Sequence, residues 1–192
     1  MHTPHPRQIP PNGNLDPYLA PQYSLANRVR RQLWNVCWAL FYRASPRTAF
    51  SWRAFLLRSF GAKLGACCHF YPQSRIWAPW NLVCEDIVVV SDRAILYNPK
   101  LLYLASHAII SEDAYLCGAT HDYNNPAFPV VSYPMRIGRY AWIAARACVS
   151  PGVNIAEGAV LGLAAVATRN LEPWGVYVGA PAKKVKERVS IA

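Results

Sequence analysis

The sequence predicts an all-β core, a left-handed parallel β-helix of hexapeptide repeats, with an N-terminal helical cap and a short C-terminal helix. Two patterns lead to this prediction: apolar residues that recur every six positions in the second half, and helical apolar spacing in a basic first part. The chain has 192 residues, of which 53% are hydrophobic and 16% charged. This length and composition are sufficient for a buried core and exclude a disordered polyelectrolyte.

The chain begins with a segment of unusual composition, residues 1–24, which is rich in proline and asparagine. We expect this segment to be a disordered tail. Residues 25–75 are expected to form the basic helical cap, with a break near Ser45-Pro46. Two rows follow helical spacing in this cap. The apolar row consists of Leu33, Val36, Cys37, Leu40 and Phe41, and the aromatic row consists of Trp34, Trp38 and Tyr42.

The β-helix is expected to occupy residues 76–182, where the spacing of large apolar residues fits neither a helix nor a strand. A period of six is typical of a coil built from three short strands, each with one inward apolar residue. The interval from Leu116 to Ile137 predicts one full coil with a three-residue insertion. Residues 183–192 are expected to form the C-terminal helix or tail. The predicted inward residues are Val90, Leu96, Leu104, Ile110, Leu116, Ile137, Ile143, Val149, Ile155 and Leu161.

The formal net charge of +10 is unevenly distributed. Residues 17–84 contain nine cations and no acid, whereas the second half is almost neutral. Such an excess is typical of proteins that bind nucleic acid, a membrane surface or an anionic ligand. We expect no nucleic-acid partner, because the aromatic residues of the basic part have helical spacing and form no sheet platform.

Two interpretations of the basic cap stay open. In one, the tryptophans pack against the open end of the β-helix and the arginines are solvated. In the other, residues 25–60 make a peripheral contact with anionic lipid. The chain shows no signal-peptide pattern and no run of about 20 apolar residues. Its six cysteines have neither CxxC nor zinc spacing. We therefore expect a cytoplasmic protein without a metal, or one that lies peripherally at the inner face of the membrane.

One of the five histidines, His121, stands where the repeat is interrupted, beside Asp122. An imidazole at the edge of a rigid coil is a candidate general base. Its orienting partner is either the Asp122 carboxylate or a backbone carbonyl. The alternative is a loop histidine with only a structural hydrogen bond.

The residues around His121 resemble a known family, the hexapeptide-repeat sugar O-acetyltransferases, and most of all the WcaF-like colanic acid biosynthesis acetyltransferases. The matching segments are Thr120-His-Asp-Tyr123, Asn125-Pro-Ala-Phe-Pro129, Ile137-Gly-Arg-Tyr-Ala-Trp-Ile-Ala-Ala-Arg-Ala147, Ile76-Trp-Ala-Pro-Trp-Asn81 and Gly179-Ala-Pro-Ala-Lys183. The resemblance implies a homotrimer that transfers acetyl from acetyl-CoA to a sugar hydroxyl at a cleft between subunits. It also implies a role in exopolysaccharide or cell-surface glycan biosynthesis, with a lipid-linked or nucleotide-linked sugar among the acceptors.

The resemblance also implies roles for single residues. His121 matches the catalytic base, and the acceptor side is matched by Asn98, Asp122 and Tyr123. Trp142 matches an aromatic residue beside the thioester. The remaining CoA positions are Ala144 and Gly162 along the coil, and Thr168, Arg169 and Lys183 near the nucleotide and phosphates. Leu163 departs from the family, since relatives often have a small residue there, and it is expected to narrow the pantetheine groove.

The chemistry requires a base for the hydroxyl and donors for the oxyanion, but no serine or cysteine nucleophile. We therefore expect direct transfer from acetyl-CoA to the acceptor. A non-catalytic β-helix scaffold is the main alternative. A zinc-dependent carbonic anhydrase of this fold would need three converging histidines, and the repeat offers only His107 and His121.

Overall fold

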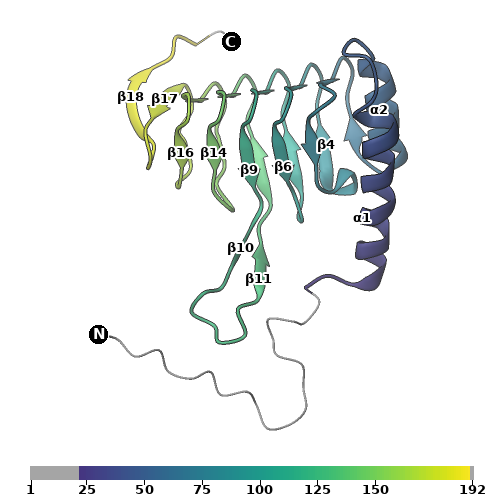
Figure 1. Ribbon diagram of the computed structural model, residues 1–192. Helices are drawn as coiled ribbons and strands as arrows, with labels where there is room; N and C mark the ends of the chain where they lie inside the picture. The colour runs from purple at the N-terminus through teal and green to yellow at the C-terminus, as the bar shows by residue number, and fades with distance from the viewer. Residues whose placement is uncertain (1–21, 191–192) are drawn as a thin grey trace.

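Short strands stack into three parallel sheets that form the sides of a prism, and a helical cap crosses one end (Figure 1). This computed structural model describes residues 22–190. The tail predicted over residues 1–24 therefore lies almost entirely outside the described residues. The three sheets match the three strands per coil that the hexapeptide period predicts.

The first sheet contains β1 (Lys63–Leu64), β4 (Leu82–Cys84), β7 (Leu102–Leu104) and β12 (Met135–Ile137). The second sheet contains β2 (His69–Phe70), β5 (Val89–Val90), β8 (Ile109–Ile110), β13 (Trp142–Ile143), β15 (Val160–Leu161), β17 (Gly175–Val178) and β18 (Lys183–Glu187). The third sheet contains β3 (Arg75–Ile76), β6 (Ile95–Tyr97), β9 (Tyr115–Cys117), β14 (Cys148–Val149) and β16 (Val166–Ala167). A separate hairpin consists of β10 (Ala119–His121) and β11 (Val130–Ser132). The helices are α1 (Leu25–Cys37), the π-helix η2 (Trp38–Tyr42), α2 (Phe50–Ser59) and the short η3 (Pro79–Asn81).

The predicted hexapeptide core is confirmed, because all ten predicted inward residues are at most 1% exposed. Equivalent residues of successive coils lie directly above one another, as Val90 pairs with Ile110 and Ile143 pairs with Leu161. The residues four positions later are mostly fully buried alanines, such as Ala108. Apolar side chains thus form one continuous column inside the prism.

Two details of the predicted repeat are wrong. The first strand begins at Lys63, so the boundary predicted at residue 76 lies inside the β-helix. The interval after Leu116 is not a full coil, because Leu116 pairs with Val149 in the next coil of the same sheet. The residues between them include the β10–β11 hairpin, which adds no strand to the prism and therefore leaves no trace of the six-residue period.

The predicted C-terminal helix is also wrong, because Lys183–Glu187 forms β18, antiparallel to β17. The outer edge of β17 presents unpaired backbone groups, and an added strand satisfies them. All five residues of β18 are exposed. Charged residues along such an edge strand disfavour pairing with another chain.

At one corner of the prism, the residue in each successive coil has a left-handed backbone conformation. Ile87, His107 and Tyr140 occupy it in successive coils, with φ of 61°, 62° and 57°. In the next coil this corner is Gly158, with φ of 65°. A Cβ at Gly158 would lie 2.3 Å from the ring of Trp174, so only glycine fits there.

The cap packs through its aromatic row, and its side chains cover the open edges of the first coil. The indole Nε1 of Trp34 donates to Ile76 O at 2.7 Å, and that of Trp38 donates to Ser74 O at 2.9 Å. Both carbonyls belong to the β3 edge. Arg53, which is fully buried, donates from Nε to the Phe70 carbonyl of the β2 edge at 2.5 Å. The cap thus replaces strand pairing with side-chain donors.

The structure confirms that Trp34 and Trp38 of the cap pack inward, but four of the five residues in the predicted apolar row point away from the β-helix. Leu33, Val36, Leu40 and Phe41 are exposed, and only Cys37 is partly buried. Residues on opposite faces of one helix cannot both meet the prism. Within residues 22–190, no helix has the length and apolar content needed to cross a membrane.

Candidate functional site

His121 ends β10 of the hairpin that projects from the prism, and it pairs with Val130 of β11 (Figure 1). Its Nδ1 lies 2.9 Å from the carbonyl oxygen of Phe128. A carbonyl oxygen only accepts, so Nδ1 carries the proton and Nε2 keeps its lone pair. The imidazole also stacks on the Phe128 ring, with 4.3 Å between centroids and 14° between planes. These two contacts hold the ring in one orientation, with Nδ1 directed at the Phe128 carbonyl.

The two residues after His121 have different positions. The Asp122 carboxylate accepts from the Asn124 backbone N–H at 3.1 Å, which shapes the loop as an Asx-turn. Of the two orienting partners considered for His121, the structure thus supports the carbonyl. Tyr123 is 79% exposed near the tip of the hairpin. Its ring is available to a ligand or to a second copy of the chain.

Asn98 has a structural position, and the structure gives no support to the acceptor-side role predicted for it. Its side chain is 2% exposed. Its Oδ1 accepts from Ala78 N at 3.0 Å, and its Nδ2 donates to Ala78 O at 2.9 Å. Both polar atoms of the amide are thus used between adjacent coils, and none remains for a substrate.

Three of the predicted CoA residues share the corner between the second and third sheets. Trp142 in β13 is exposed, and its Nε1 donates to Ser111 Oγ at 2.9 Å. Ala144 and Gly162 occupy equivalent places in successive coils, because Ile143 pairs with Leu161. A Cβ on Gly162 would lie 2.9 Å from Val178 Cγ1, so a small residue is needed for the coils to stack.

The other predicted CoA residues lie near the C-terminal end of the prism. Thr168 and Arg169 follow β16, and Lys183 begins β18; all three are exposed. Leu163 follows Gly162 and is 71% exposed, so its side chain borders the surface along which CoA was predicted to lie.

A single chain does not bring His121 together with the predicted CoA residues. The hairpin leaves the prism after β9, at the corner between the third and first sheets, whereas Trp142, Ala144 and Gly162 lie at the corner between the second and third. A depression of about 640 Å³, with Glu85, Arg136 and Arg139 in its lining, is at neither position. Within one copy, His121 and the predicted CoA residues therefore lie at two different corners of the prism.

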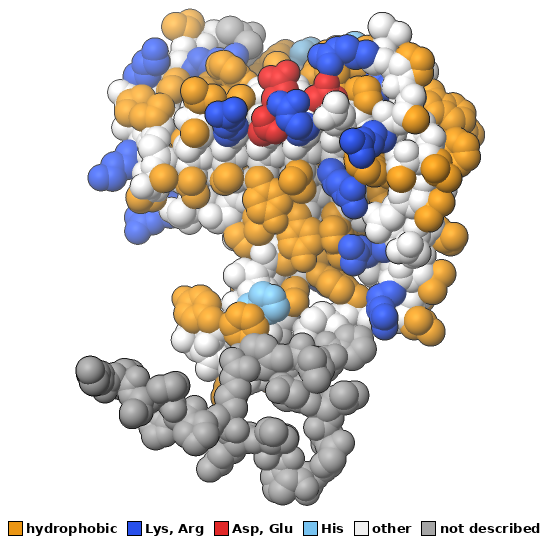
Figure 2. All heavy atoms as spheres, viewed as in Figure 1, with side chains coloured by type: hydrophobic (Ala, Val, Ile, Leu, Met, Phe, Trp, Pro, Cys, Tyr) orange, Lys and Arg blue, Asp and Glu red, His pale blue; other side chains and the backbone are white. Residues whose placement is uncertain are grey.

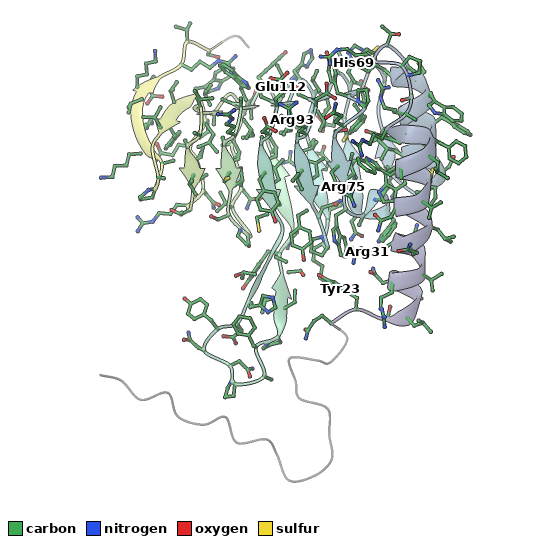
Figure 3. All side chains as sticks on the ribbon, viewed as in Figure 1. Tyr23, Arg31, His69, Arg75, Arg93 and Glu112 are labelled. Carbon is green, nitrogen blue, oxygen red and sulfur yellow. The ribbon has the colours of Figure 1, made fainter. Side chains whose placement is uncertain are left out.

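The sequence did not predict an aromatic cluster that lies beside the hairpin. The Tyr23 and Trp77 rings are 5.1 Å apart, the Trp77 and Tyr97 rings are 5.5 Å apart, and the Arg31 guanidinium lies 3.9 Å from the Trp77 ring. Figure 3 shows Tyr23 and Arg31 on the side of α1 that faces the hairpin. Burial, and then the hydrogen bond with Tyr23, raises the pKa of Tyr97, so this phenol stays protonated at neutral pH.

Gln22, the residue before Tyr23 of the cluster, contacts the hairpin, because Val130 N donates to Gln22 Oε1 at 3.2 Å. Val130 is the cross-strand partner of His121. Only Trp77 had a signal in the sequence, within the Ile76–Asn81 segment. The other members come from distant parts of the chain, so no local pattern indicates them.

The positions of the possible metal ligands among the described residues bear on the three-histidine zinc site. Within residues 22–190, no three His, Cys, Asp or Glu side chains gather as the ligands of a metal ion would. His107 stacks on Tyr140, with ring centroids 4.7 Å apart, whereas His121 stacks on Phe128 in the hairpin. The structure thus offers no support for the three-histidine zinc site.

Comparison with known proteins gives relatives that match most of the chain. The "Putative colanic acid biosynthesis acetyltransferase WcaF" of Escherichia coli K12 is 36% identical over 163 residues, which cover 85% of this chain and 90% of that protein. A chloramphenicol acetyltransferase of Klebsiella aerogenes is 44% identical over 52 residues, or 27% of this chain and 25% of its own length. No family model matches the chain.

Solved structures share the fold at low identity. A hexapeptide-repeat acetyltransferase from Vibrio cholerae, complexed with acetyl coenzyme A, has a TM-score of 0.76 at 18% identity and covers 88% of this chain and 93% of its own. A galactoside acetyltransferase in complex with coenzyme A has a TM-score of 0.70 at 17% identity, with coverages of 85% and 83%. These likenesses establish the β-helix of hexapeptide repeats.

Proposed function

The chain belongs to the family of the colanic acid biosynthesis acetyltransferase WcaF, and from this premise we propose that it transfers acetyl from acetyl-CoA to a sugar hydroxyl, with His121 as the general base. The observation that carries the proposal is the Nδ1 contact with the Phe128 carbonyl, which leaves Nε2 with a lone pair. The product would be an O-acetylated sugar for an exopolysaccharide or a cell-surface glycan.

The proposed reaction is a direct transfer in a ternary complex. Nε2 of His121 takes the hydroxyl proton while the hydroxyl oxygen attacks the thioester carbon. The tetrahedral intermediate carries an oxyanion, which backbone N–H groups of the coil turns are expected to stabilise. Its collapse breaks the carbon–sulfur bond, and the proton passes from the imidazolium to the leaving CoA thiolate. The Phe128 carbonyl holds the Nδ1 proton throughout, so the ring keeps its orientation.

We propose that the active enzyme is a homotrimer, because one copy has His121 and the predicted CoA residues at different corners of the prism. The hairpin of one copy would place His121 beside Trp142, Ala144 and Gly162 of the next. Acetyl-CoA would lie along that corner, with Thr168 near its nucleotide. The charges of Arg169 and Lys183 suit its phosphates, since both side chains are exposed.

The aromatic cluster supports a sugar acceptor. Pyranose rings have apolar C–H faces that pack against aromatic rings. Next to the hairpin, the Trp77 ring contacts the rings of both Tyr23 and Tyr97. Arg31 adds donors for hydroxyl or phosphate oxygens. A nucleotide-linked or lipid-linked sugar therefore fits the proposal. The proposed location is the cytoplasm, including the inner face of the membrane if a lipid carries the sugar.

The experiment that tests the proposal is an acceptor screen in which released CoA thiol is measured with purified full-length protein. Nucleotide sugars, lipid-linked sugars and simple glycosides are each supplied with acetyl-CoA, and acetylated product is identified by mass spectrometry. We expect thiol release that requires one class of acceptor. Calorimetry with acetyl-CoA accompanies the screen: no binding at millimolar concentration would contradict the proposal and favour a non-catalytic scaffold.

A further inference from the structure

Eight large apolar side chains cover the outer side of the cap, facing away from the β-helix. We call them the outer face, and each is between 43% and 71% exposed. The members are Leu25, Val29, Leu33, Val36, Leu40, Phe41, Trp52 and Phe55. Figure 2 shows hydrophobic side chains along this side of the molecule, at the right of the view. Contiguous apolar surface on this scale marks an interaction site.

The fold does not require an apolar outer face. The cap packs through the opposite side of α1, where Trp34 is 1% exposed and bonded to the β3 edge. Polar residues on the outer side would leave that packing unchanged. The aromatic members are held in place by two contacts. Trp52 Nε1 donates to Phe41 O at 3.0 Å, and the Trp52 ring stacks on the Phe55 ring with centroids 5.7 Å apart. The outer face is thus an ordered surface.

Positive charge borders the outer face. Helical spacing places Arg28 along one border of the α1 stripe and Arg30 along the other, and both are exposed. The Arg30 guanidinium donates to Phe60 O at 3.1 Å and lies 4.3 Å from the Trp80 ring, so Arg28 is the freer of the two. Arg28 lines a shallow hollow of about 410 Å³ beside Leu25 and Val29, together with the amides of Gln32 and Asn35. Such a hollow offers cationic and amide donors to a phosphate oxygen next to apolar surface.

The charge distribution of the cap favours an anionic bilayer over a second copy of the chain as the partner of the outer face. Residues 17–84 hold nine cations and no acid. A second copy seated on the outer face would bring Arg28 and Arg30 against identical arginines, with no acid of the cap to pair with them. An anionic bilayer instead provides an apolar layer for the leucines and phosphates for the arginines.

We infer that the outer face of the cap binds the surface of an anionic lipid bilayer, with its apolar side chains among the upper acyl segments and Arg28 on lipid phosphates. This binding goes beyond the proposed acyl transfer and does not depend on it. It would hold the β-helix with its long axis directed away from the membrane, because the cap crosses the end of the prism (Figure 1).

The test is co-sedimentation of the full-length protein with vesicles of phosphatidylcholine alone, or with one third phosphatidylglycerol. We expect binding to the anionic vesicles that weakens as the salt is raised from about 0.1 M to about 1 M. The double variant Leu33→Ser with Leu40→Ser should bind about tenfold or more weakly, because binding strength follows the buried apolar area. The matched control is Val185→Ser with Val189→Ser, two exposed valines near the far end, which should bind as the unmodified protein does.

A second measurement tests whether the outer face itself lies in the lipid. Brominated lipids should quench tryptophan fluorescence of the bound protein, and Trp52→Phe should remove most of that quenching, because Trp52 is the exposed tryptophan of the described cap. The inference is overturned if neutral and anionic vesicles bind equally, or if the two double variants bind alike. It is also overturned if Leu33→Ser with Leu40→Ser changes the oligomeric mass in sedimentation velocity without changing vesicle binding.

Discussion

The orientation of His121, and with it the role proposed for this residue, depends on a partner that side-chain substitution cannot remove, because Phe128 contributes its backbone carbonyl. His121→Ala should lower kcat by about 10²–10⁴, the range for loss of a general acid–base group. The KM for acetyl-CoA should change little, since the ring is not among the predicted CoA contacts. Steady-state kinetics with the acceptor from the screen give both values.

The matched control is His69→Ala, because His69 is exposed and stacks on Phe50 of the cap. We expect its kcat to equal that of the unmodified enzyme. Turnover by His121→Ala close to the unmodified rate would contradict the assigned base.

Arg53 is the residue on which the cap most depends. It is fully buried, and besides the Phe70 carbonyl its guanidinium donates to Ser45 Oγ at 2.8 Å and to the Pro46 and Arg47 carbonyls at 2.7 Å each. Arg53→Met keeps the volume but leaves these acceptors without donors. Each unmet buried group costs about 1–3 kcal/mol, so we expect the free energy of unfolding to fall by roughly 3 kcal/mol or more.

Urea denaturation measures this change, with Arg43→Met as the control because Arg43 is an exposed arginine of the same cap. An equal loss in both variants would show that the buried donors are not what stabilises the cap.

At the scale of elements, Glu85 joins two neighbouring strands of the first sheet. Its carboxylate accepts from Tyr103 Oη, and from the backbone N–H and Oγ of Ser106 at 2.8 and 2.9 Å. The hydrogen bond from Tyr103, followed by those from Ser106, lowers the pKa of Glu85. A lowered folded-state pKa adds stability above the unfolded value of about 4.3, and this stability is lost as the pH falls through the folded value.

We therefore expect Glu85→Gln to lower the melting temperature at pH 7, and the difference from the unmodified protein to shrink as the pH falls below about 4.3. Thermal melts between pH 7 and pH 3 provide the measurement. Glu112→Gln serves as the control, since this exposed carboxylate lies on the same solenoid (Figure 3). A difference that stays constant with pH would refute the role of the ionised carboxylate.

The elements also show which parts of the fold the sequence could predict. The interior column was predictable because each coil repeats one steric requirement, as Ile110 and Ile143 illustrate. The cap was ambiguous because α1 has two apolar faces. The choice between them depends on Trp34 Nε1 reaching the β3 edge. Neither β18 nor the hairpin follows the period, so neither was predictable from it.

The candidate site was predictable in part for the same reason. The break in the repeat identified His121, and the resemblance supplied positions for CoA. The contact of Tyr23 with Trp77 joins residues far apart in the chain, and only the folded cap creates it. The position of Asn98 in the sequence does not show that both its polar atoms bond to Ala78, so its structural role was not predictable.

On the scale of the whole molecule, the direction of the prism connects the proposed trimer to the proposed membrane contact. The cap crosses one end of the β-helix, and its outer face points along the long axis (Figure 1). Three copies related by a three-fold axis parallel to the prism would direct all three outer faces to one side. A flat bilayer would then meet three apolar faces at once, which raises the effective affinity without new contacts.

The proposed site between subunits is tested by co-expressing two inactive variants of the chain. His121→Ala lacks the base but keeps the CoA corner. Leu163→Trp keeps the base and should block the CoA corner, and a large side chain is tolerated because Leu163 is 71% exposed. Each variant alone should be inactive. In trimers assembled at random from equal amounts, about a quarter of the interfaces join an intact hairpin to an intact CoA corner, so co-expression should restore about a quarter of the normal activity. A site within one chain would give no recovery. Light scattering of the mixture should give a mass near three times 21.5 kDa, which shows that assembly itself is unaffected.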